Sequence, residues 1–498
     1  MSVHRPILKK LLTHPRHPYI TDDQRTYTGL TLYVAALHVA SAIERTTKAK
    51  HVGVLLPTSG MFPIAALASW MLGRVVVPLN YLLKPDELQY VIDNSDIDTI
   101  ITAGPMLDFL EQAPKVENLI KLDELNFKKL PRPRRSANAG DDDLACLLYT
   151  SGTSGKPKGV MLTHGNLTAA IKAAAHHASI TPDDVFMGVL PQFHCFGLID
   201  LTLLPLTLGS KILYTARFNP AKMLGLAREH KPSVLIIIPA MYNALANSKS
   251  GKHGDLDSLR YCVSGGEPLS DAVSSKFKEK FGVTINEGFG MTETSAASNW
   301  CLPEMYKPHS VGPTLPGIEA RIISQETGEP APEDGEGELQ LRGPTIMKGY
   351  YKLPEETAKA IEPDGFLHTG DMARIDSDGH VHITGRIKEM LIVGGENVFP
   401  REIEEVIDSH PAVSACGVVG RPDDARGEVP IAFVEPMEGE TIDTQEVLNL
   451  CREKLSGYKV PKQIRVIDQL PRNPTGKILR RDLKALLESE GENPAKGA

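Results

Sequence analysis

Short apolar runs alternate with amphipathic stretches through the first half of the chain. Continuous apolar runs occupy residues 51–56, 75–78, 97–102, 210–214, 233–238 and 259–263. Helix-forming composition marks residues 60–72, 167–178 and 221–229. Continuous apolar runs are typical of strands that are buried on both faces. Strands that alternate with helices predict parallel sheets covered by helices.

The pattern changes beyond Gly312. Residues 335–342 and 379–384 alternate apolar and polar positions, which predicts half-exposed antiparallel strands in a small barrel or meander. After residue 387 the pattern predicts a further α+β unit, with helices at 400–408 and 444–455 and strands at 413–419 and 431–434. The predicted fold class is therefore α/β with an α+β cap. Residues 1–386 form a large domain of two parallel-type sheets plus a small β-barrel, and residues 387–498 form a smaller mobile domain.

Composition narrows the classes of function. With 498 residues, 41% apolar and 23% charged, the chain has material for about three domain-sized units and is not a disordered protein. Its formal charge of −8 argues against a protein that coats nucleic acid, which needs clustered Lys and Arg. The Pro-rich segment 128–143 changes from basic to acidic, has no interleaved aromatic residues and is interpreted as a solvated loop.

The cysteines and the apolar segments bear on the compartment. Six cysteines stand apart from one another, without a CxxC pair, which does not predict a structural zinc site and suits a reducing compartment. The N-terminal residues have no sustained apolar core, and residues 64–79 contain Arg74 and are too short for a membrane span. The expected location is cytoplasmic, with peripheral membrane contact and the oligomeric state left open.

The segment 149–160, YTSGTSGKPKGV, carries the strongest chemical signal. It follows an apolar strand at 144–148 and combines hydroxyls, glycines and two lysines. Backbone N–H groups at glycines, hydroxyl donors and lysine charge are what a polyphosphate needs. It is not a Walker A loop, because Pro157 follows Gly155-Lys156 where that pattern has Ser or Thr. Composition alone leaves a Gly/Ser surface hairpin as an equal alternative.

Five further blocks follow in order: SGGEP at 264–268, GFGMTET at 288–294, HTGD at 368–371, GRIKEMLIVGGENVFPREIEE at 385–405 and PRNPTGKILRRD at 471–482. Together with segment 149–160 they resemble the adenylate-forming superfamily of acyl-CoA synthetases, peptide-synthetase adenylation domains and luciferase. The chain looks most like a stand-alone fatty-acyl-CoA ligase. The resemblance implies an ATP-dependent carboxylic acid:CoA ligase that first makes acyl-adenylate and pyrophosphate, then acyl-CoA and AMP. It implies ATP, Mg²⁺ and coenzyme A as co-substrate.

The resemblance also implies roles for individual residues. Thr292 would bind the α-phosphate, Glu293 would bind Mg²⁺, and Lys477 would bridge the carboxylate and the α-phosphate. Asp371 would accept hydrogen bonds from the ribose, and Arg386 would contact ribose or phosphate, although an Asp after Gly is by itself more often a turn residue. The remaining implied ATP-binding residues are Thr150, Ser151, Gly152, Thr153, Ser154, Gly155 and Lys158 for the β- and γ-phosphates, and Gly266, Glu267, Pro268, Gly288, Phe289, Gly290 and Met291 around the adenine. Phe289 stands where the family more often has tyrosine.

A second half-reaction requires a second set of residues. Lys388 falls at the family's hinge position, about which the C-terminal domain rotates. Gly394, Gly395 and Glu396 would then line a channel for the pantetheine of coenzyme A, because small residues leave room beside the backbone. A Gly-Gly turn alone is more often a plain hairpin.

The identity of the acid is the least determined feature. The implied acyl pocket is apolar and aromatic and has no Asp to pair with a substrate ammonium. A medium- or long-chain fatty acid is the first expectation, and an aryl acid of the benzoate or coumarate type is the alternative. An acyl-AMP ligase that loads a carrier protein, and a non-enzymatic pseudo-ligase, remain as rivals. The pocket residues are Phe193, His194, Phe196, Ile238, Met241, Tyr242 and Gly265.

Overall fold

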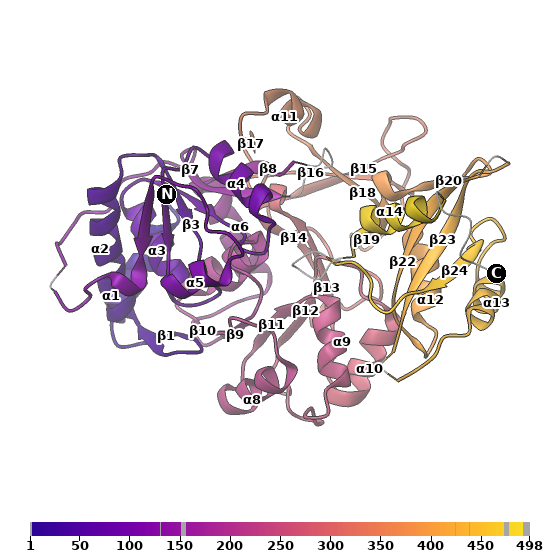
Figure 1. Cartoon of the computed structure of the whole chain (residues 1–498), viewed down its shortest axis with the longest axis horizontal. Helices are drawn as coiled ribbons and strands as arrows, with labels where there is room; N and C mark the ends of the chain where they lie inside the picture. The colour runs from indigo at the N-terminus through magenta and orange to yellow at the C-terminus, as the bar shows by residue number, and fades with distance from the viewer. Residues whose placement is uncertain are drawn as a thin grey trace.

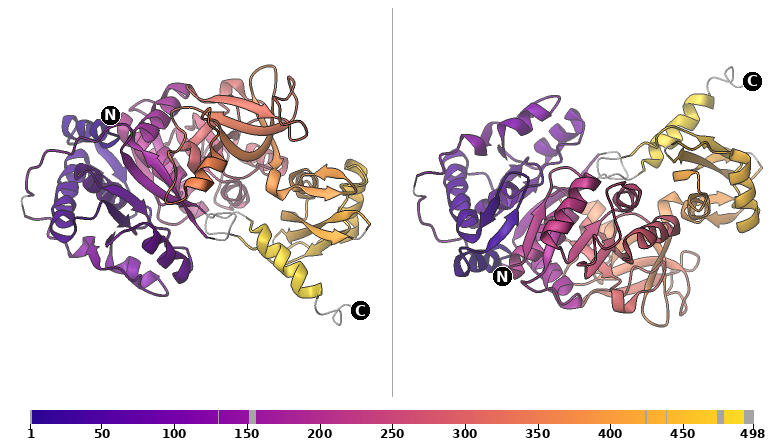
Figure 2. Two further views of the ribbon diagram at one scale, coloured as in Figure 1. Left: turned by 90° about the horizontal axis from the view of Figure 1, so that it is seen from above. Right: turned by 90° about the horizontal axis from the view of Figure 1, so that it is seen from below.

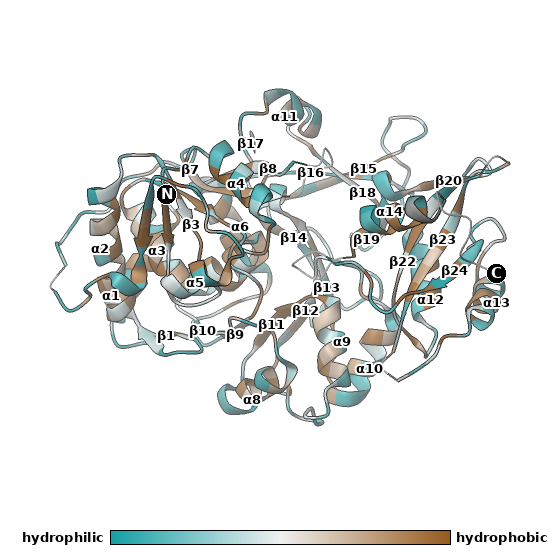
Figure 3. Ribbon diagram, in the orientation of Figure 1, coloured by the Kyte–Doolittle hydropathy of each residue, from teal (hydrophilic) through white to brown (hydrophobic). Residues whose placement is uncertain are grey.

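The computed structural model describes residues 2–129, 131–150, 156–423, 425–437, 439–472 and 478–491. Figure 1 shows the chain running from an N-terminal sheet through a second sheet to a separate C-terminal body, and Figure 2 shows that body at one end of the molecule. Strands such as β3 and β11 are coloured as hydrophobic in Figure 3, as expected for strands buried beneath helices.

The first sheet has seven strands in the order β17-β8-β7-β4-β3-β5-β6. Its five strands from β7 to β6 run parallel, and β8 and β17 add antiparallel pairs at one edge. The strands span Gly349–Tyr350 (β17), Lys158–Thr163 (β8), Leu144–Thr150 (β7), Val75–Pro78 (β4), His51–Val54 (β3), Thr99–Thr102 (β5) and Asn118–Lys121 (β6). The predicted strands at 51–56, 75–78 and 97–102 are therefore confirmed.

Helices cover this sheet. Ten of the eleven residues of α3 are buried, since this helix is apolar all round and packs against α2 inside the largest apolar core. Thr28 begins α2 with a capping box to Thr31. The helices of this region are α1 (His4–Thr13), α2 (Gly29–Thr46), α3 (Met61–Met71), α4 (Pro85–Asn94), α5 (Gly104–Phe109) and the short η1 (Leu122–Glu124).

The second sheet has eight strands in the order β14-β13-β12-β11-β9-β10-β1-β2. Its six central strands pair in parallel, and the outermost strands β14 and β2 are antiparallel. Two parallel-type sheets were predicted, and both are present. The strands span Ala296–Trp300 (β14), Asn286–Met291 (β13), Tyr261–Ser264 (β12), Val234–Ile237 (β11), Val185–Gly188 (β9), Lys211–Tyr214 (β10), Pro18–Thr21 (β1) and Thr26–Thr28 (β2).

Most connections in this sheet are helical. The segment Phe196–Leu203 (η2) is a π-helix, a rare form that the sequence pattern did not predict. Helix α6 begins at a capping box between Thr163 and Asn166, and α10 ends at the left-handed Gly282. The helices and short turns are α6 (His164–His177), α7 (Leu204–Leu208), α8 (Pro220–His230), α9 (Pro239–Asn247), α10 (Asp271–Phe281), η3 (Thr292–Thr294) and η4 (Pro303–Met305).

A smaller antiparallel sheet follows, in the order β15-β16-β18-β19. Its strands pair along an open path with β15 and β19 outermost, so the predicted small barrel takes the form of an open sheet. Its pairing register shifts at bulges near Gln340 and Ala373. The elements are β15 (Glu319–Ile323), β16 (Gly337–Arg342), α11 (Pro354–Ala360), β18 (Leu367–Ile375) and β19 (Val381–Arg386).

The C-terminal unit has its own sheet and its own apolar cores. Its five strands centre on the long β22-β23 pair, and its two clusters of buried apolar residues draw only on residues 391–487. This separation supports the predicted division after residue 386, which stays a prediction. The elements are η5 (Ile387–Glu389), β20 (Leu391–Val393), β21 (Glu396–Val398), α12 (Pro400–Asp408), β22 (Val413–Asp423), β23 (Gly427–Pro436), α13 (Thr444–Lys454), β24 (Gln463–Val466) and α14 (Arg480–Gly491).

None of the helices in the described part of the chain has the length and apolar composition that a bilayer span requires.

Candidate active site

Four predicted site segments leave the same edge of the eight-stranded sheet. Segment 191–197 follows β9, residues 238–242 follow β11, residues 265–268 follow β12, and residues 288–293 end and follow β13. These strands are parallel neighbours, so their carboxyl ends lie side by side. The edge beyond the carboxyl ends of parallel strands is where open α/β sheets bind ligands.

A pocket at this edge gathers residues from distant parts of the chain. The N-terminal sheets contribute Gly266, Glu267 and Pro268, the β13 residues, and Asp371 with Arg386. The C-terminal unit contributes Arg401 and Arg480 to the same wall. The structure thus brings together most of the residues predicted for adenine and ribose. The predicted members of the lining are Gly266, Glu267, Pro268, Gly288, Phe289, Gly290, Asp371 and Arg386.

Asp371 and Arg386 face each other across two neighbouring strands. They are register partners in the β18-β19 pair, and Arg386 Nε donates to Asp371 Oδ1 at 2.9 Å. Asp371 is 2% exposed. A buried carboxylate of this kind needs charge-assisted donors, and ribose hydroxyls would supply more of them.

The lysine of the predicted phosphate loop lies at the start of β8. Thr150 and Lys158 pair across β7 and β8, so the loop between them connects two antiparallel strands. Lys158 Nζ contacts Glu356 Oε2 of α11 at 2.6 Å and lies 5.1 Å from the centre of the Tyr350 ring. The hydrogen bonds from Lys158 and Lys359 lower the pKa of Glu356 to about 2, so this contact is a full ion pair.

Glu293 belongs to the same cluster of polar side chains. It is 9% exposed, and Tyr350 donates its phenolic hydrogen to Glu293 Oε1 at 2.9 Å. Burial and the Glu293 carboxylate raise the pKa of Tyr350, so the phenol stays protonated and remains a donor. Glu293, Tyr350, Lys158 and Glu356 therefore form one connected network beside the phosphate loop.

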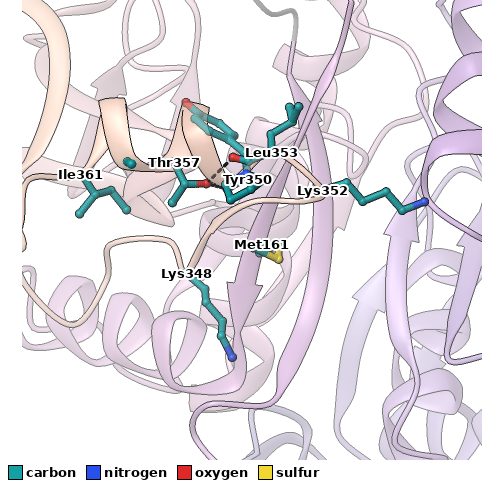
Figure 4. Close-up of a pocket in the computed structure, with 9 residues that line it drawn as sticks. Met161, Lys348, Tyr350, Lys352, Leu353, Thr357 and Ile361 are labelled. Atoms are coloured by element: carbon teal, nitrogen blue, oxygen red, sulfur yellow. Dashed lines mark hydrogen bonds between the residues drawn. The ribbon is translucent and has the colours of Figure 1, made fainter.

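Tyr350 is held by α11 in a second pocket, drawn in Figure 4. Its backbone N–H donates to Thr357 Oγ1 at 2.8 Å, and Thr357 Oγ1 donates to Leu353 O at 2.9 Å, in the region of the dashed lines in that figure. Gly349 precedes it at φ +138°, and a Cβ there would lie 2.5 Å from Thr357 Cγ2. A glycine is required at this position because α11 packs directly on the strand.

The turn that carries Thr292 and Glu293 has an unusual backbone. Ser295 and Ala296 both adopt left-handed conformations, at φ +58° and +71°, which non-glycine residues seldom do. Thr294 Oγ1 donates to Met291 O and Ala296 O, and Ser295 Oγ donates to Thr345 O. These bonds offset the strain and fix where Glu293 points.

Thr292 contacts a buried thiol beneath the site. Its hydroxyl donates to Cys195 Sγ at 3.4 Å. Burial raises the pKa of Cys195 to about 12, so this sulfur remains a neutral thiol and a packing group.

The predicted acyl-pocket residues fall into two groups. Phe196 packs against Gly265, where an added Cβ would be 2.7 Å from Phe196 Cζ, and Ile238 Cγ2 lies 3.8 Å from the corresponding point at Gly266. The Phe193 ring meets Tyr81 edge-on, 5.0 Å between centres. His194 and Met241 are half-buried beside these residues in the chain.

Tyr242 has a different role. It is fully buried, donates its phenol to Val263 O at 2.9 Å and packs its ring against Phe277 of α10. It therefore belongs to the core under α9 and α10, and we omit it from the proposed acyl pocket. In the sequence, Tyr242 follows the apolar strand at 233–238, and this pattern does not distinguish a core position from a pocket position.

Some predicted residues lie outside the described ones: Ser151, Gly152, Thr153, Ser154, Gly155 and Lys477. The residues that flank Lys477 are described. Arg472 and Ile478 form an antiparallel bridge, and Leu479 N donates to Pro471 O at 2.8 Å. Arg480 Nη2 then donates to both carboxylate oxygens of Glu404, at 2.7 and 2.6 Å. Its Nη1 pairs with Glu389 Oε2 at 2.7 Å.

The predicted hinge residue, Lys388, immediately precedes Glu389, which pairs with Arg480. Lys388 is exposed within η5, the single turn that joins β19 to the C-terminal unit. Gly394 and Gly395 form a two-residue turn between β20 and β21 with φ of +65° and +91°. They are exposed and are not among the residues that line the nucleotide-side pocket. In this arrangement the Gly-Gly turn is a hairpin of the type that requires positive φ.

Sequence reasoning missed Tyr350, Glu356, Arg401 and Arg480. The segment GYYKLPEET reads as a strand end and a helix start, since Pro354 and two glutamates favour an N-terminal turn. Nothing in that pattern indicates that Glu356 faces Lys158. Arg401 and Arg480 stood in recognised blocks, but a lone arginine in a sequence is usually a surface charge.

Comparison with known proteins decides the family. The model of the AMP-binding enzyme family matches residues 9–351, and that of its C-terminal domain matches residues 402–477. The chain belongs to the AMP-binding enzyme family.

The relatives of this AMP-binding enzyme include CoA ligases of different specificity. It is 32% identical to a feruloyl-CoA synthase of an Amycolatopsis species over 92% of this chain and 93% of the relative. It is 34% identical to a long-chain-fatty-acid–CoA ligase of Bacillus subtilis over 90% of this chain and 86% of the relative. The enzyme is thus an AMP-forming acyl-CoA synthetase, an ATP-dependent carboxylic acid:CoA ligase.

A solved relative shares the whole architecture. ATP-bound MatB from Rhodopseudomonas palustris matches with a TM-score of 0.88 and 30% identity, covering 98% of this chain and 99% of that one. The apo form of the same protein matches with a TM-score of 0.79 at the same identity.

The Lys158–Glu356 ion pair generates a first prediction. A triphosphate and Glu356 would compete for the same ammonium, so Glu356→Gln is expected to lower the KM for ATP, by about two- to fivefold for a partly exposed ion pair. Lys158→Gln is the matched variant and should raise this KM by roughly tenfold to a hundredfold, as expected for a lost charge-assisted bond. Steady-state pyrophosphate release measures both. A KM that rises in Glu356→Gln would contradict the competition.

The contact between the C-terminal unit and β19 generates a second prediction. Arg401 Nη1 donates to Ile383 O, and a Cβ at Gly385 would overlap the Phe399 ring. Arg401→Ala should therefore weaken the contact that holds the C-terminal unit against β19. Adenylation should slow by about five- to tenfold, the effect of one charged hydrogen bond. Transfer from supplied acyl-adenylate to coenzyme A should be unaffected.

The control is Arg452→Ala on the outer helix α13, where the guanidinium binds Asn449. Pyrophosphate release and single-turnover thioester formation separate the two half-reactions. An equal loss in both, or the same loss in Arg452→Ala, would count against a contact that selects this arrangement.

Proposed function

We propose that this enzyme activates an apolar carboxylic acid, first of all a medium- or long-chain fatty acid, and transfers the acyl group to coenzyme A. The observation that carries the proposal is the pocket where Gly266–Pro268, Phe289, Asp371 and Arg386 meet beside the apolar Phe196, Ile238 and Gly265. A nucleoside site that adjoins an apolar site is what joining AMP to an apolar acid requires.

The chemistry consists of two displacements. A carboxylate oxygen attacks the α-phosphorus of ATP, the bond to the β-phosphate oxygen breaks, and pyrophosphate leaves. The thiol of coenzyme A then attacks the carbonyl carbon, its proton is lost, and AMP leaves with the electrons of the acyl–oxygen bond. Both steps build negative charge on oxygen, so catalysis consists mainly of positioning and charge neutralisation.

In this proposal the residues of the site divide the work. Lys158 neutralises the outer phosphates, Thr292 donates to the α-phosphate, Phe289 stacks on adenine, and Asp371 with Arg386 holds the ribose. Lys477, with the flanking residues anchored through Arg480, follows the charge from carboxylate to α-phosphate because an ammonium on a flexible stem can do so.

The donor set also fits Mg²⁺. A carboxylate 9% exposed at Glu293, next to the Thr292 hydroxyl and the proposed phosphate oxygens, is the type of site that a hard cation prefers. Bound there, Mg²⁺ would neutralise phosphate charge and orient the leaving group. Tyr350 would keep Glu293 oriented toward it through the hydrogen bond already present.

The C-terminal unit is proposed as a lid, residues 387–498, that turns about Lys388 between the two steps. Its separate apolar cores and its single connection through η5 favour motion as one body. The TM-score is higher against ATP-bound MatB, 0.88, than against apo MatB, 0.79. This difference supports a position of the C-terminal unit that is suited to adenylation. After the turn, Gly394, Gly395 and Glu396 would border the channel for pantetheine.

An aryl acid is the second candidate. It is favoured by the edge-on ring pair of Phe193 and Tyr81, a geometry that can extend to a third aromatic ring. The feruloyl-CoA synthase relative gives it further support.

A panel of acids tests the proposal. AMP formation is measured with fatty acids of increasing length, benzoate- and coumarate-type acids, and amino acids, each with and without coenzyme A. We expect fatty acids to give the highest kcat/KM and AMP turnover to depend on coenzyme A.

The variant Lys477→Ala should lose adenylation but retain transfer from supplied acyl-adenylate. A preference for aryl acids would replace the first substrate candidate with the second. Turnover that is independent of coenzyme A but requires a carrier protein would contradict the proposed acceptor, and no acid-dependent signal at all would contradict the proposed chemistry.

A further inference from the structure

A histidine beside the proposed ribose site is held between two carboxylates. His368 lies at the start of β18, three residues before Asp371. Its Nδ1 is 2.8 Å from Glu338 Oε2, and its Nε2 is 2.7 Å from Glu362 Oε1. A neutral imidazole has one N–H, so two such contacts fit an imidazolium that donates from both nitrogens.

The charge state of this ring follows from its surroundings. Burial by itself lowers the pKa of His368, but the hydrogen bonds to Glu338 and Glu362 outweigh burial and raise the pKa above its ordinary 6.5. The Gln340 amide nitrogen Nε2 lies 3.0 Å from Nδ1 and donates toward Glu338 Oε2 at 3.5 Å, while Gln340 Oε1 accepts from Arg321 Nε at 2.8 Å.

These groups line one groove on the face of the small sheet. Besides His368, the charged groups on its lining are Glu338 of β16, Glu362 after α11 and Arg321 of β15. Gln340 lies between Arg321 and His368. Arg321 is itself paired with Asp364 at 2.8 Å.

Glu338 connects the histidine to the backbone of the ribose site. Its second oxygen, Oε1, accepts from the Gly370 N–H at 3.1 Å. Gly370 has φ of +70°, a left-handed conformation that glycine adopts readily. Thr369 completes the turn, because its hydroxyl donates to Leu339 O at 2.6 Å and accepts from Asp371 N at 3.1 Å.

We propose that protonated His368 is a positioning residue for the ribose site: it fixes Glu338, Glu338 fixes the Gly370 N–H, and this holds Asp371 in the orientation that binds the ribose hydroxyls. The inference rests on the proposed function, in which Asp371 binds ribose. His368 touches no substrate in this scheme and acts through the backbone.

The scheme sets a direction for pH dependence. Because the charged imidazole is favoured in the folded site, the bridge is complete below the ordinary histidine pKa and is lost as pH rises through the raised one. Affinity for a nucleoside with ribose hydroxyls should therefore fall as pH rises. The affinity for a nucleoside without those hydroxyls should not change with pH.

The experiment compares adenosine with 2′,3′-dideoxyadenosine, neither of which carries a phosphate that titrates near neutrality. Dissociation constants for the full chain are measured calorimetrically across the neutral and mildly alkaline range. In the wild type, the affinity for adenosine should fall by about fivefold with rising pH, which is the effect of one positioned hydrogen bond. The affinity for the dideoxy compound should stay constant.

Three variants complete the test. At every pH, His368→Gln should bind adenosine with the weak affinity that the wild type shows at high pH. Glu362→Gln removes one carboxylate from the bridge, so the midpoint of the adenosine curve should move to lower pH. Asp364→Asn is the matched control, because this exposed carboxylate lies on the same turn but pairs with Arg321, and it should leave the midpoint unchanged.

The outcomes separate the two levels of inference. An unshifted midpoint in Glu362→Gln, or a His368→Gln variant that binds adenosine as the wild type does, overturns the positioning role. Equal weakening of both nucleosides would also overturn it, since that indicates general loss of structure. A wild-type chain that binds neither nucleoside would instead contradict the proposed function.

Discussion

The active site depends on one constraint, the alignment of parallel strands in the eight-stranded sheet. Strands β9, β11, β12 and β13 end at a common edge, so the segments that follow them must meet there. The close approach of Phe196 to the backbone at Gly265 is possible only because Gly265 lacks a side chain, and the next residue, Gly266, adopts the left-handed φ of +84° that glycine tolerates. The hydrophobic energy that fixes the sheet therefore also fixes the boundary between the proposed adenine and acyl sites. Function is added at this edge without disturbing the core beneath it, as in other open α/β sheets.

A second level of organisation comes from the segment that runs from Tyr350 to Glu362. It contacts three motifs that are far apart in sequence: Tyr350 donates to Glu293, Glu356 pairs with Lys158, and Glu362 pairs with His368. Each contact involves an ionised or strongly polar group, for which a fixed partner is worth more than an exposed one. Because α11 is short and closely packed on β17 through Gly349 and Thr357, the three contacts cannot move independently. The segment thus relates the phosphate, metal and ribose regions of the proposed site to one another.

Much of the fold could be predicted from the sequence because its signals are local. The apolar strands at 75–78 and the helix at 400–408 occur where the pattern placed them. The π-helix at Phe196–Leu203 and the role of Tyr242 could not be predicted, since an apolar run carries no sign of the wider helix or of which sheet face a ring will meet. The site could be found through recognised motifs, but Glu356 and Glu338 could not. Glu356 matters because of Lys158, 198 residues away, and Glu338 because of His368, 30 residues away. Long-range ion pairs leave no periodic pattern in the chain.

The organisation of the proposed lid would explain how one site can serve two steps. Arg480 binds Glu404 of α12 and Glu389 beside the proposed hinge, so the residues flanking Lys477 are tied to the body of the C-terminal unit. A turn about Lys388 would then remove Lys477 as part of a rigid unit, with no need for a separate loop movement. The contacts named here across the joint, Arg401 to Ile383 O and Phe399 against Gly385, are a single hydrogen bond and one ring on a backbone. Contacts of that size can be exchanged at modest cost, whereas the partly buried ion pairs of Arg480 with Glu404 and Glu389 would cost more to break. The balance therefore favours a lid that moves as a whole.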